Sequence, residues 1–188
     1  MKKEIIVHIV FLLAFFLLIS IYKTFSLSLE IGNSNWFTAE YLIFWLGGVI
    51  GMLMVFSDHF IYTYFLRPDE PSSQQAKSLI SERKYLQAVD FLVKSHKTLD
   101  NLVFHNANFQ SIFLLFGFFV ITSTASILGR GIVLGFLLHL IIDMLRDLIE
   151  TKSTDRWFTK FPVSLTFEQK RWYLGLHIAL TLIIGIFL

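Results

Sequence analysis

Apolar residues occur in five long runs along this chain, and shorter polar stretches separate the runs. A helix of ~20 apolar residues spans the ~30 Å hydrocarbon core of a bilayer. Each run has about that length, which predicts an all-α, polytopic membrane helix bundle that forms one integral membrane domain over residues 1–188. The predicted transmembrane helices cover residues 4–22, 39–65, 104–127, 130–149 and 168–188.

A segment of different character, residues 68–102, separates the second run from the third. Pro68 and Pro71 interrupt the chain at its start, and beyond them apolar residues recur at helical spacing instead of in a continuous run. We expect a short helical hairpin outside the bilayer, with residues 73–102 offering a surface to a protein partner.

Two local patterns refine the membrane helices. Gly47, Gly48 and Gly51 in the second run permit close contact with another helix. Thr166 and Gln169 form a capping box that predicts the start of the last helix.

Composition agrees with a membrane protein. The chain is 55% hydrophobic with 21 Phe, against roughly 45–50% apolar residues in an ordinary soluble domain. It has no cysteine, which excludes disulfides, thiol catalysis and thiolate metal sites. The net charge of +2 gives no reason to expect a nucleic acid partner, and membrane lipid is the partner we expect.

The basic residues indicate an orientation. With five spans, every lysine and arginine except Lys23 and Arg130 falls on one side of the membrane. The positive-inside rule then places the N-terminus and the hairpin in the cytoplasm and the C-terminus outside the cell membrane.

The fourth run carries polar side chains in its second half, which is costly inside a membrane. His139 and Asp143 lie four residues apart and therefore share one helix face. An imidazole nitrogen and a carboxylate are ligands that suit zinc or manganese. The same spacing also suits a structural hydrogen-bonded pair between helices, so the pattern leaves both interpretations open.

The predicted topology brings polar residues from all five runs into the cytoplasmic half of the membrane. Unrelated helix pairs give no reason for such a convergence, which favours a shared polar or metal site. His8 and His177 are its weaker members, since either could be a lone histidine near the interface or support another ligand. The residues concerned are His8, Asp58, His59, His105, His139, Asp143, Asp147 and His177.

Three motifs resemble the YdjM-like membrane-bound metal-dependent hydrolases, a family distantly related to zinc-dependent phospholipase C. The family pattern is roughly PDIDH, then HRGxTHS, then GxxLGYLxHxxxD. Here the corresponding stretches are VFSDH at 55–59, HNANFQS at 105–111 and GIVLGFLLHLIID at 131–143, of which the third is the most specific. The resemblance covers the second to fourth spans.

The resemblance implies a divalent metal, zinc or alternatively manganese, in a helical membrane bundle. His8 matches an early histidine that such proteins often carry. Phe56 and Gln110 depart from the pattern, because the family has an aspartate and a second histidine there. The implied metal ligands are Asp58, His59, His105, His139 and Asp143.

These observations lead to a hypothesis of a metal-dependent hydrolase that acts on a phosphodiester or lipid-like substrate at the cytoplasmic leaflet. Asp147 would serve as base or would orient a ligand, and Arg146 or Tyr62 would contact a phosphate. The alternative is a non-catalytic membrane scaffold or complex subunit whose His and Asp cluster is structural. An ion or proton carrier is a third class, for which the chain shows no inverted repeat.

Overall fold

The computed structural model describes residues 2–31, 39–95, 102–123 and 126–187, and within these ranges the chain forms only helices and loops. The prediction of an all-helical fold is therefore confirmed. The elements are α1 (Lys2–Ile31), α2 (Ala39–Met54), α3 (Ser57–Ile61), the π-helix η1 (Tyr62–Leu66), α4 (Pro71–Ser81), α5 (Tyr85–Ser95), α6 (Ala107–Ser123), α7 (Ile127–Thr151), the 3-10 helix η3 (Asp155–Phe158) and α8 (Phe167–Ile186).

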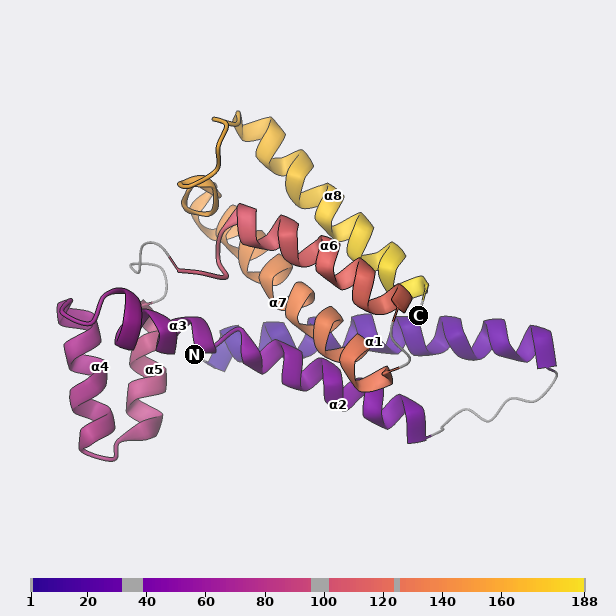
Figure 1. The fold of residues 1–188 in the computed structure, drawn as a ribbon, viewed down its shortest axis with the longest axis horizontal. Helices are drawn as coiled ribbons and strands as arrows, with labels where there is room; N and C mark the ends of the chain where they lie inside the picture. Colours follow the sequence, from indigo (N-terminus) through magenta and orange to yellow (C-terminus); the bar gives the residue numbers. More distant parts are fainter. Residues whose placement is uncertain (1, 32–38, 96–101, 124–125, 188) are drawn as a thin grey trace.

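Helix α7 is the centre of the bundle. It packs against α1, α2, α6 and α8 (Figure 1). Every residue from Val133 to Met144 is buried, as expected for a helix that is apolar on all sides. The polar residues of this stretch are therefore held inside the protein and not at its surface.

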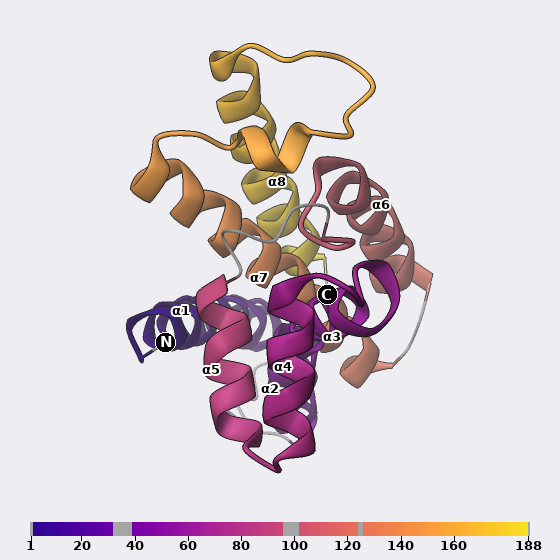
Figure 2. The same ribbon diagram turned by 90° about the vertical axis from the view of Figure 1, so that its left-hand side faces the viewer.

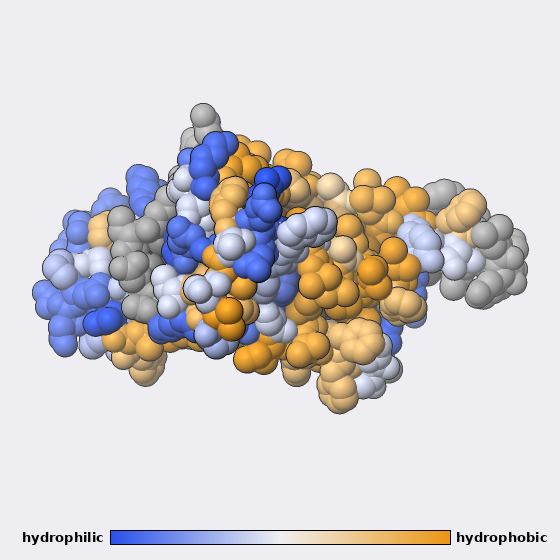
Figure 3. Space-filling model, turned by 90° about the horizontal axis from the view of Figure 1, so that it is seen from above, coloured by the Kyte–Doolittle hydropathy of each residue, from blue (hydrophilic) through white to orange (hydrophobic). Residues whose placement is uncertain are grey.

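Two described stretches are long and apolar enough to cross a membrane by length and composition, Ile6–Ser26 and Glu40–Leu66. Helix α6 is a shorter apolar helix. The prediction of five spans is thus not confirmed as a whole. Large apolar side chains are nevertheless exposed on α1, α2, α6 and α8, and Figure 3 shows apolar surface over much of one face of the bundle, with polar surface gathered towards one end.

The first helix is longer than the predicted range of 4–22, because α1 continues to Ile31. No glycine or proline occurs before Gly32 to end it. Beyond Tyr22, the Thr24 hydroxyl donates to the Ser20 carbonyl at 2.8 Å and lies 3.0 Å from the Tyr41 hydroxyl of α2.

The second predicted span, 39–65, is not one continuous helix. It breaks at Val55 and Phe56, where backbone N–H groups bond to carbonyls three residues earlier, and it resumes as α3 and η1. Such local changes of winding recur at functional sites. Here the break falls directly before Asp58 and His59, which both point into the interior and are buried.

Glycines let α2 and α7 touch backbone to backbone. A Cβ atom at Gly51 would overlap the carbonyl oxygen of Ile132, and one at Gly135 would overlap that of Gly48. The close contact predicted for the glycines of the second run is confirmed, and its partner is the glycine-containing face of α7.

Helices α4 and α5 form a hairpin across one end of the bundle (Figure 2). Pro71 occupies the first turn of α4, and Arg83 ends that helix with a positive φ of 58° in a Schellman-type turn. The Tyr62 hydroxyl anchors the hairpin by donating to Glu70 at 2.5 Å. Residues 96–101 of the predicted insert lie outside the described residues.

The capping box at the start of α8 is confirmed. The Thr166 hydroxyl accepts from the Gln169 backbone N–H, and the Gln169 side chain accepts from the Thr166 backbone N–H. The helix begins at Phe167, one residue before the predicted boundary.

Candidate metal centre

One buried carboxylate, Asp143 of α7, faces three imidazole rings from three different parts of the chain. Its Oδ1 lies 3.0 Å from Nε2 of His8 on α1. Its Oδ2 lies 3.1 Å from Nε2 of His139, one turn earlier on α7, and 3.1 Å from Nε2 of His105 in the loop before α6. The pair predicted from the spacing of His139 and Asp143 is therefore in contact.

Three of these side chains form a group that can hold a metal ion. Ligand atoms of His8, His139 and Asp143 all lie within 4.8 Å of one another, and all three residues are buried. Two imidazole nitrogens and a carboxylate oxygen are a ligand set typical of zinc and also suited to manganese. The His8 and His139 rings are also in contact, with their centroids 4.4 Å apart.

His105 is held in place by Asp58, a residue of α3. The carboxylate of Asp58 accepts hydrogen bonds from the backbone N–H groups of Val103, Phe104 and His105, at 2.7, 2.9 and 3.3 Å. Its Oδ2 also lies 2.8 Å from Nδ1 of His105. Asp58 thus fixes both the loop and the ring, an arrangement found behind metal-binding histidines.

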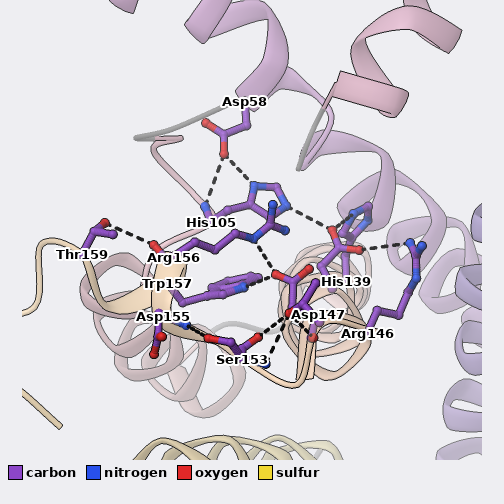
Figure 4. Close-up of polar contacts among 12 residues, drawn as sticks. Asp58, His105, His139, Arg146, Asp147, Ser153, Asp155, Arg156, Trp157 and Thr159 are labelled. Carbon is purple, nitrogen blue, oxygen red and sulfur yellow. Dashed lines mark hydrogen bonds and ion pairs between the residues drawn. The ribbon is translucent and has the colours of Figure 1, made fainter. Parts of the chain in front are cut away.

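Both nitrogens of the His105 ring face carboxylates, as Figure 4 shows for Asp58. A neutral imidazole carries one proton and can donate to only one of them. The second contact requires a further proton, on His105 or on a carboxyl group, or a cation shared with Asp143. Nδ1 of His139, in contrast, has no hydrogen-bond partner among the described residues. This donor arrangement fits a bound divalent cation.

The sequence supports this loop locally. The Asn106 side-chain oxygen accepts from the Phe109 backbone N–H at 2.8 Å, which caps the start of α6. Its amide group donates to the Val103 carbonyl at 2.5 Å. Asn106 therefore joins the helix start to the segment that carries His105.

Phe56 takes up space where the resembled family has an aspartate. Its ring packs edge-on against His139 at 5.3 Å and lies 6.4 Å from the His59 ring. An aromatic ring cannot ligate a metal as a carboxylate does, so this side of the site is apolar.

Asp147 lies one turn beyond Asp143 but belongs to a different group. Its Oδ2 accepts from Nε of Arg156 at 2.5 Å and from Nε1 of Trp157 at 2.7 Å (Figure 4). The fully buried Trp157 ring in turn packs against the His105 ring at 5.4 Å. Asp147 is thus placed to hold Trp157 against His105.

The polar loop after α7 is tied down at its surface as well. Lys170 of α8 contacts Asp155 at 2.5 Å. The hydrogen bond from Lys170 lowers the pKa of Asp155 below its ordinary value. This ion pair joins α8 to the first residue of η3, the element that also carries Arg156 and Trp157.

A cavity of about 550 Å³ opens beside His8, His139 and Asp143, the metal-binding group of the candidate site. Its polar end contains Asp143, Arg146 and histidines from α1, α3, α7 and the loop before α6. The rest is lined by apolar side chains of α1, α2 and α5. The Arg146 guanidinium lies 3.9 Å from Asp143 and 3.2 Å from Glu150. A volume of this size and a few converging polar groups are typical of small-molecule sites, which are ~300–1,000 Å³.

The remaining predicted site residues divide into two sets. His59 is buried, lines the cavity and lies 6.4 Å from the His105 ring. Tyr62, Gln110 and Asp147 do not line the cavity. Tyr62 bonds to Glu70 instead, and both polar atoms of the buried Gln110 side chain lack hydrogen-bond partners among the described residues. His177, on α8, bonds to the Tyr173 carbonyl at 2.9 Å and stacks on its ring.

Sequence reasoning missed the residues that support His105 from behind. Trp157, in the polar and aromatic loop after α7, was the available signal, because a large aromatic side chain there needs a buried place. Asn106, directly after His105, was a second signal as a helix cap. The sequence does not show that Trp157 and Asn106 support His105.

Comparison with protein-family models, with curated proteins and with solved structures finds no match for this chain.

Proposed function

We propose that this chain is a membrane-embedded, metal-dependent hydrolase of the phosphodiester class. The observation that carries the proposal is the buried group of His8, His139 and Asp143, which opens into a cavity that also contains Arg146. The resemblance of the three motifs to the YdjM-like hydrolases supports the same reaction class. We place the chain in the cell membrane with five spans and a cytoplasmic N-terminus, as the basic residues indicate.

His8, His139 and Asp143 would hold the ion. A divalent metal, zinc or manganese, would polarise a phosphoryl oxygen and lower the pKa of a bound water towards ~7. Around it, Asp58 orients His105, whose Nε2 is directed at the same point and can take up or release a proton there. Arg146 supplies a positive charge at the wall of the cavity, where it would bind a substrate phosphate. Asp147, which the sequence suggested as base, is assigned here to positioning Trp157.

The runner-up is a non-catalytic scaffold whose polar cluster stabilises the bundle. Two observations favour it. The three histidines contact Asp143 directly, so the carboxylate already has partners. Phe56 also occupies the position of a family ligand. In that case residues 73–102 would be the surface that binds a protein partner.

The test is the metal content of detergent-purified protein, together with turnover of bis(4-nitrophenyl) phosphate, a soluble phosphodiester. We expect about one zinc or manganese per chain and metal-dependent turnover, both lost in the double variant His139→Ala/Asp143→Ala. His177→Ala is the matched control, since it removes a buried histidine that does not line the cavity. Metal-free wild-type protein without turnover would leave the scaffold as the better explanation.

A further inference from the structure

The cavity beside the metal-binding group has an apolar mouth. Four of its lining residues, Ile9 of α1, Val49 and Leu53 of α2 and Val89 of α5, are also 41–58% exposed on the outer surface. The cavity therefore reaches the surface between these three helices. Both membrane-crossing candidates, α1 and the α2–η1 stretch, contribute to it.

The direction of this mouth decides what can enter. In a membrane protein, exposed apolar side chains of a spanning helix face lipid and not water. Ile9, Val49 and Leu53 all belong to stretches long and apolar enough to span. A molecule that enters between them comes from the bilayer, and its hydrocarbon part meets a matching surface.

The inner part of the cavity continues this apolar lining up to the polar end. Leu12 of α1 and Met52 of α2 are buried and line it, and Val93 of α5 lies one turn beyond Val89. The polar end then presents Arg146 and the histidines around Asp143. The cavity is thus largely apolar and has at one end the Arg146 guanidinium and a group that can hold a metal ion, which match a molecule with a hydrocarbon tail and an anionic head group.

Helix α5 of the hairpin covers the cavity from outside the bundle. Val89 and Val93 line it, and Leu86, one turn before Val89, is 87% exposed. These three residues follow helical spacing and form one apolar stripe on α5. The stripe extends the lining of the cavity outwards along the hairpin, which lies across one end of the bundle (Figures 1 and 2).

We infer that the substrate is a membrane lipid with a phosphodiester head group, which enters laterally between α1 and α2 beneath α5 and lays its hydrocarbon chain against Leu12 and Met52. This inference rests on the proposed function for its chemical step. Hydrolysis adds water across one P–O bond and releases an alcohol and a phosphate monoester. The head group would lie at Arg146 and the metal-binding group, and the tail would remain in the apolar part.

Binding is tested separately from hydrolysis by photolabelling. Purified protein is irradiated with a lysophosphatidylglycerol that carries a diazirine in its acyl chain, and the labelled residues are mapped by mass spectrometry. We expect label on Leu12, Met52 and Val93, competed by unlabelled lysophosphatidylglycerol. In Val49→Trp, the indole fills the mouth, and cavity labelling should fall at least about tenfold.

Leu46→Trp is the matched control, because Leu46 lies one turn earlier on α2 and is 56% exposed without lining the cavity. It should label as wild type. Leu53→Trp is a second mouth variant, and unchanged metal content and elution volume show that each variant is folded. Val49→Trp should also lose lysophosphatidylglycerol turnover.

Label confined to outward residues such as Leu46, or cavity labelling unchanged in both mouth variants, would overturn the lateral route even if the protein binds metal and hydrolyses the soluble diester. Cavity labelling in a protein with no metal and no turnover of either compound would uphold the lipid site and defeat the proposed hydrolase.

Discussion

Asp143 and Asp147 are the same residue type, both buried and one turn apart on α7, yet their surroundings differ. Asp143 faces three histidines and lines a cavity. Asp147 faces Arg156 and the indole N–H of Trp157, away from the cavity. The first has partners that can exchange a proton or share a metal, whereas the second has partners with fixed protons.

In the proposed function, this difference separates the metal-binding site from a structural support. An arginine and an indole can only donate, so they satisfy the Asp147 carboxylate permanently. Imidazoles can donate or ligate, so the partners of Asp143 can change with a bound ion. Burial alone would have marked both carboxylates as functional. The identity of the partners distinguishes them.

The largest effect is expected at Asp143. In Asp143→Asn, the side chain keeps its shape but loses the charge that faces three imidazoles. We expect loss of the bound metal and a decrease in phosphodiester turnover of at least about 100-fold. Elemental analysis and initial rates measure the two quantities. Wild-type metal content in this variant would remove Asp143 from the metal centre.

Asp147→Asn should act on stability instead. The change weakens the hydrogen bonds to Arg156 and Trp157, and loss of a buried hydrogen-bond partner costs about 1–3 kcal/mol. Thermal unfolding in detergent should shift to lower temperature while about one metal per chain is retained. An unchanged unfolding temperature together with a lost metal would reverse the roles assigned to the two carboxylates.

Gly135→Ala tests whether the close contact between α2 and α7 sets the stability of the bundle and the geometry of the metal site. The added Cβ would overlap the Gly48 carbonyl oxygen, so α2 must move away from α7. We expect destabilisation of about 1–3 kcal/mol and weaker metal binding, because α2 leads into the segment that holds His105.

Gly175→Ala is the control for Gly135→Ala, since an added Cβ at Gly175 has no neighbour within 4 Å. Helix propensity favours alanine over glycine by about 0.5–1 kcal/mol. Both variants are compared by thermal unfolding and metal titration. If the two variants unfold at the same temperature and bind metal equally, the glycine contacts between α2 and α7 do not set the position of α2.

The smallest effect is expected at Asp155, an exposed carboxylate of η3 in the loop after α7. Its pKa is lowered by Lys170, so the ion pair stabilises the folded state at neutral pH. That contribution is complete above the ordinary aspartate pKa of ~3.9 and is lost as the pH falls through the lowered value. Asp155→Asn should cost about 0.2–1 kcal/mol at pH 7. The difference from wild type in thermal unfolding should vanish in acid, and a difference that grew in acid would contradict the assignment.

Local spacing predicted part of the site correctly. His139 and Asp143 are four residues apart, and their side chains are in contact at 3.1 Å. The same spacing does not keep Asp147 on the face that His139 and Asp143 share, because four residues turn a helix by ~400°, so each step rotates the side chain by ~40°. After two such steps Asp147 points to η3, and the spacing alone does not show that partner.

The parts that depend on tertiary contacts were beyond the sequence. His8 was treated as a weak member, yet it belongs to the group that can hold a metal. The resemblance implies Asp58 as a ligand, and in the structure its oxygens accept hydrogen bonds from the backbone N–H groups of the loop at 103–105, which the sequence does not show. The break at Val55 and Phe56, which turns Asp58 inwards, occurs without a glycine or proline, so the sequence does not predict it.

The hydrogen bonds from the loop at 103–105 to Asp58 have a consequence for how such a protein can diversify. They join two points of the chain that are 45 to 47 residues apart, and the hairpin lies between them. A segment whose ends are held together can change in length and composition at little cost to what lies outside it. Since α5 supplies part of the cavity wall, exchanging the hairpin would alter which molecules fit while the histidines around Asp143 stay where they are. The hairpin can thus vary between related proteins while the groups around Asp143 are kept.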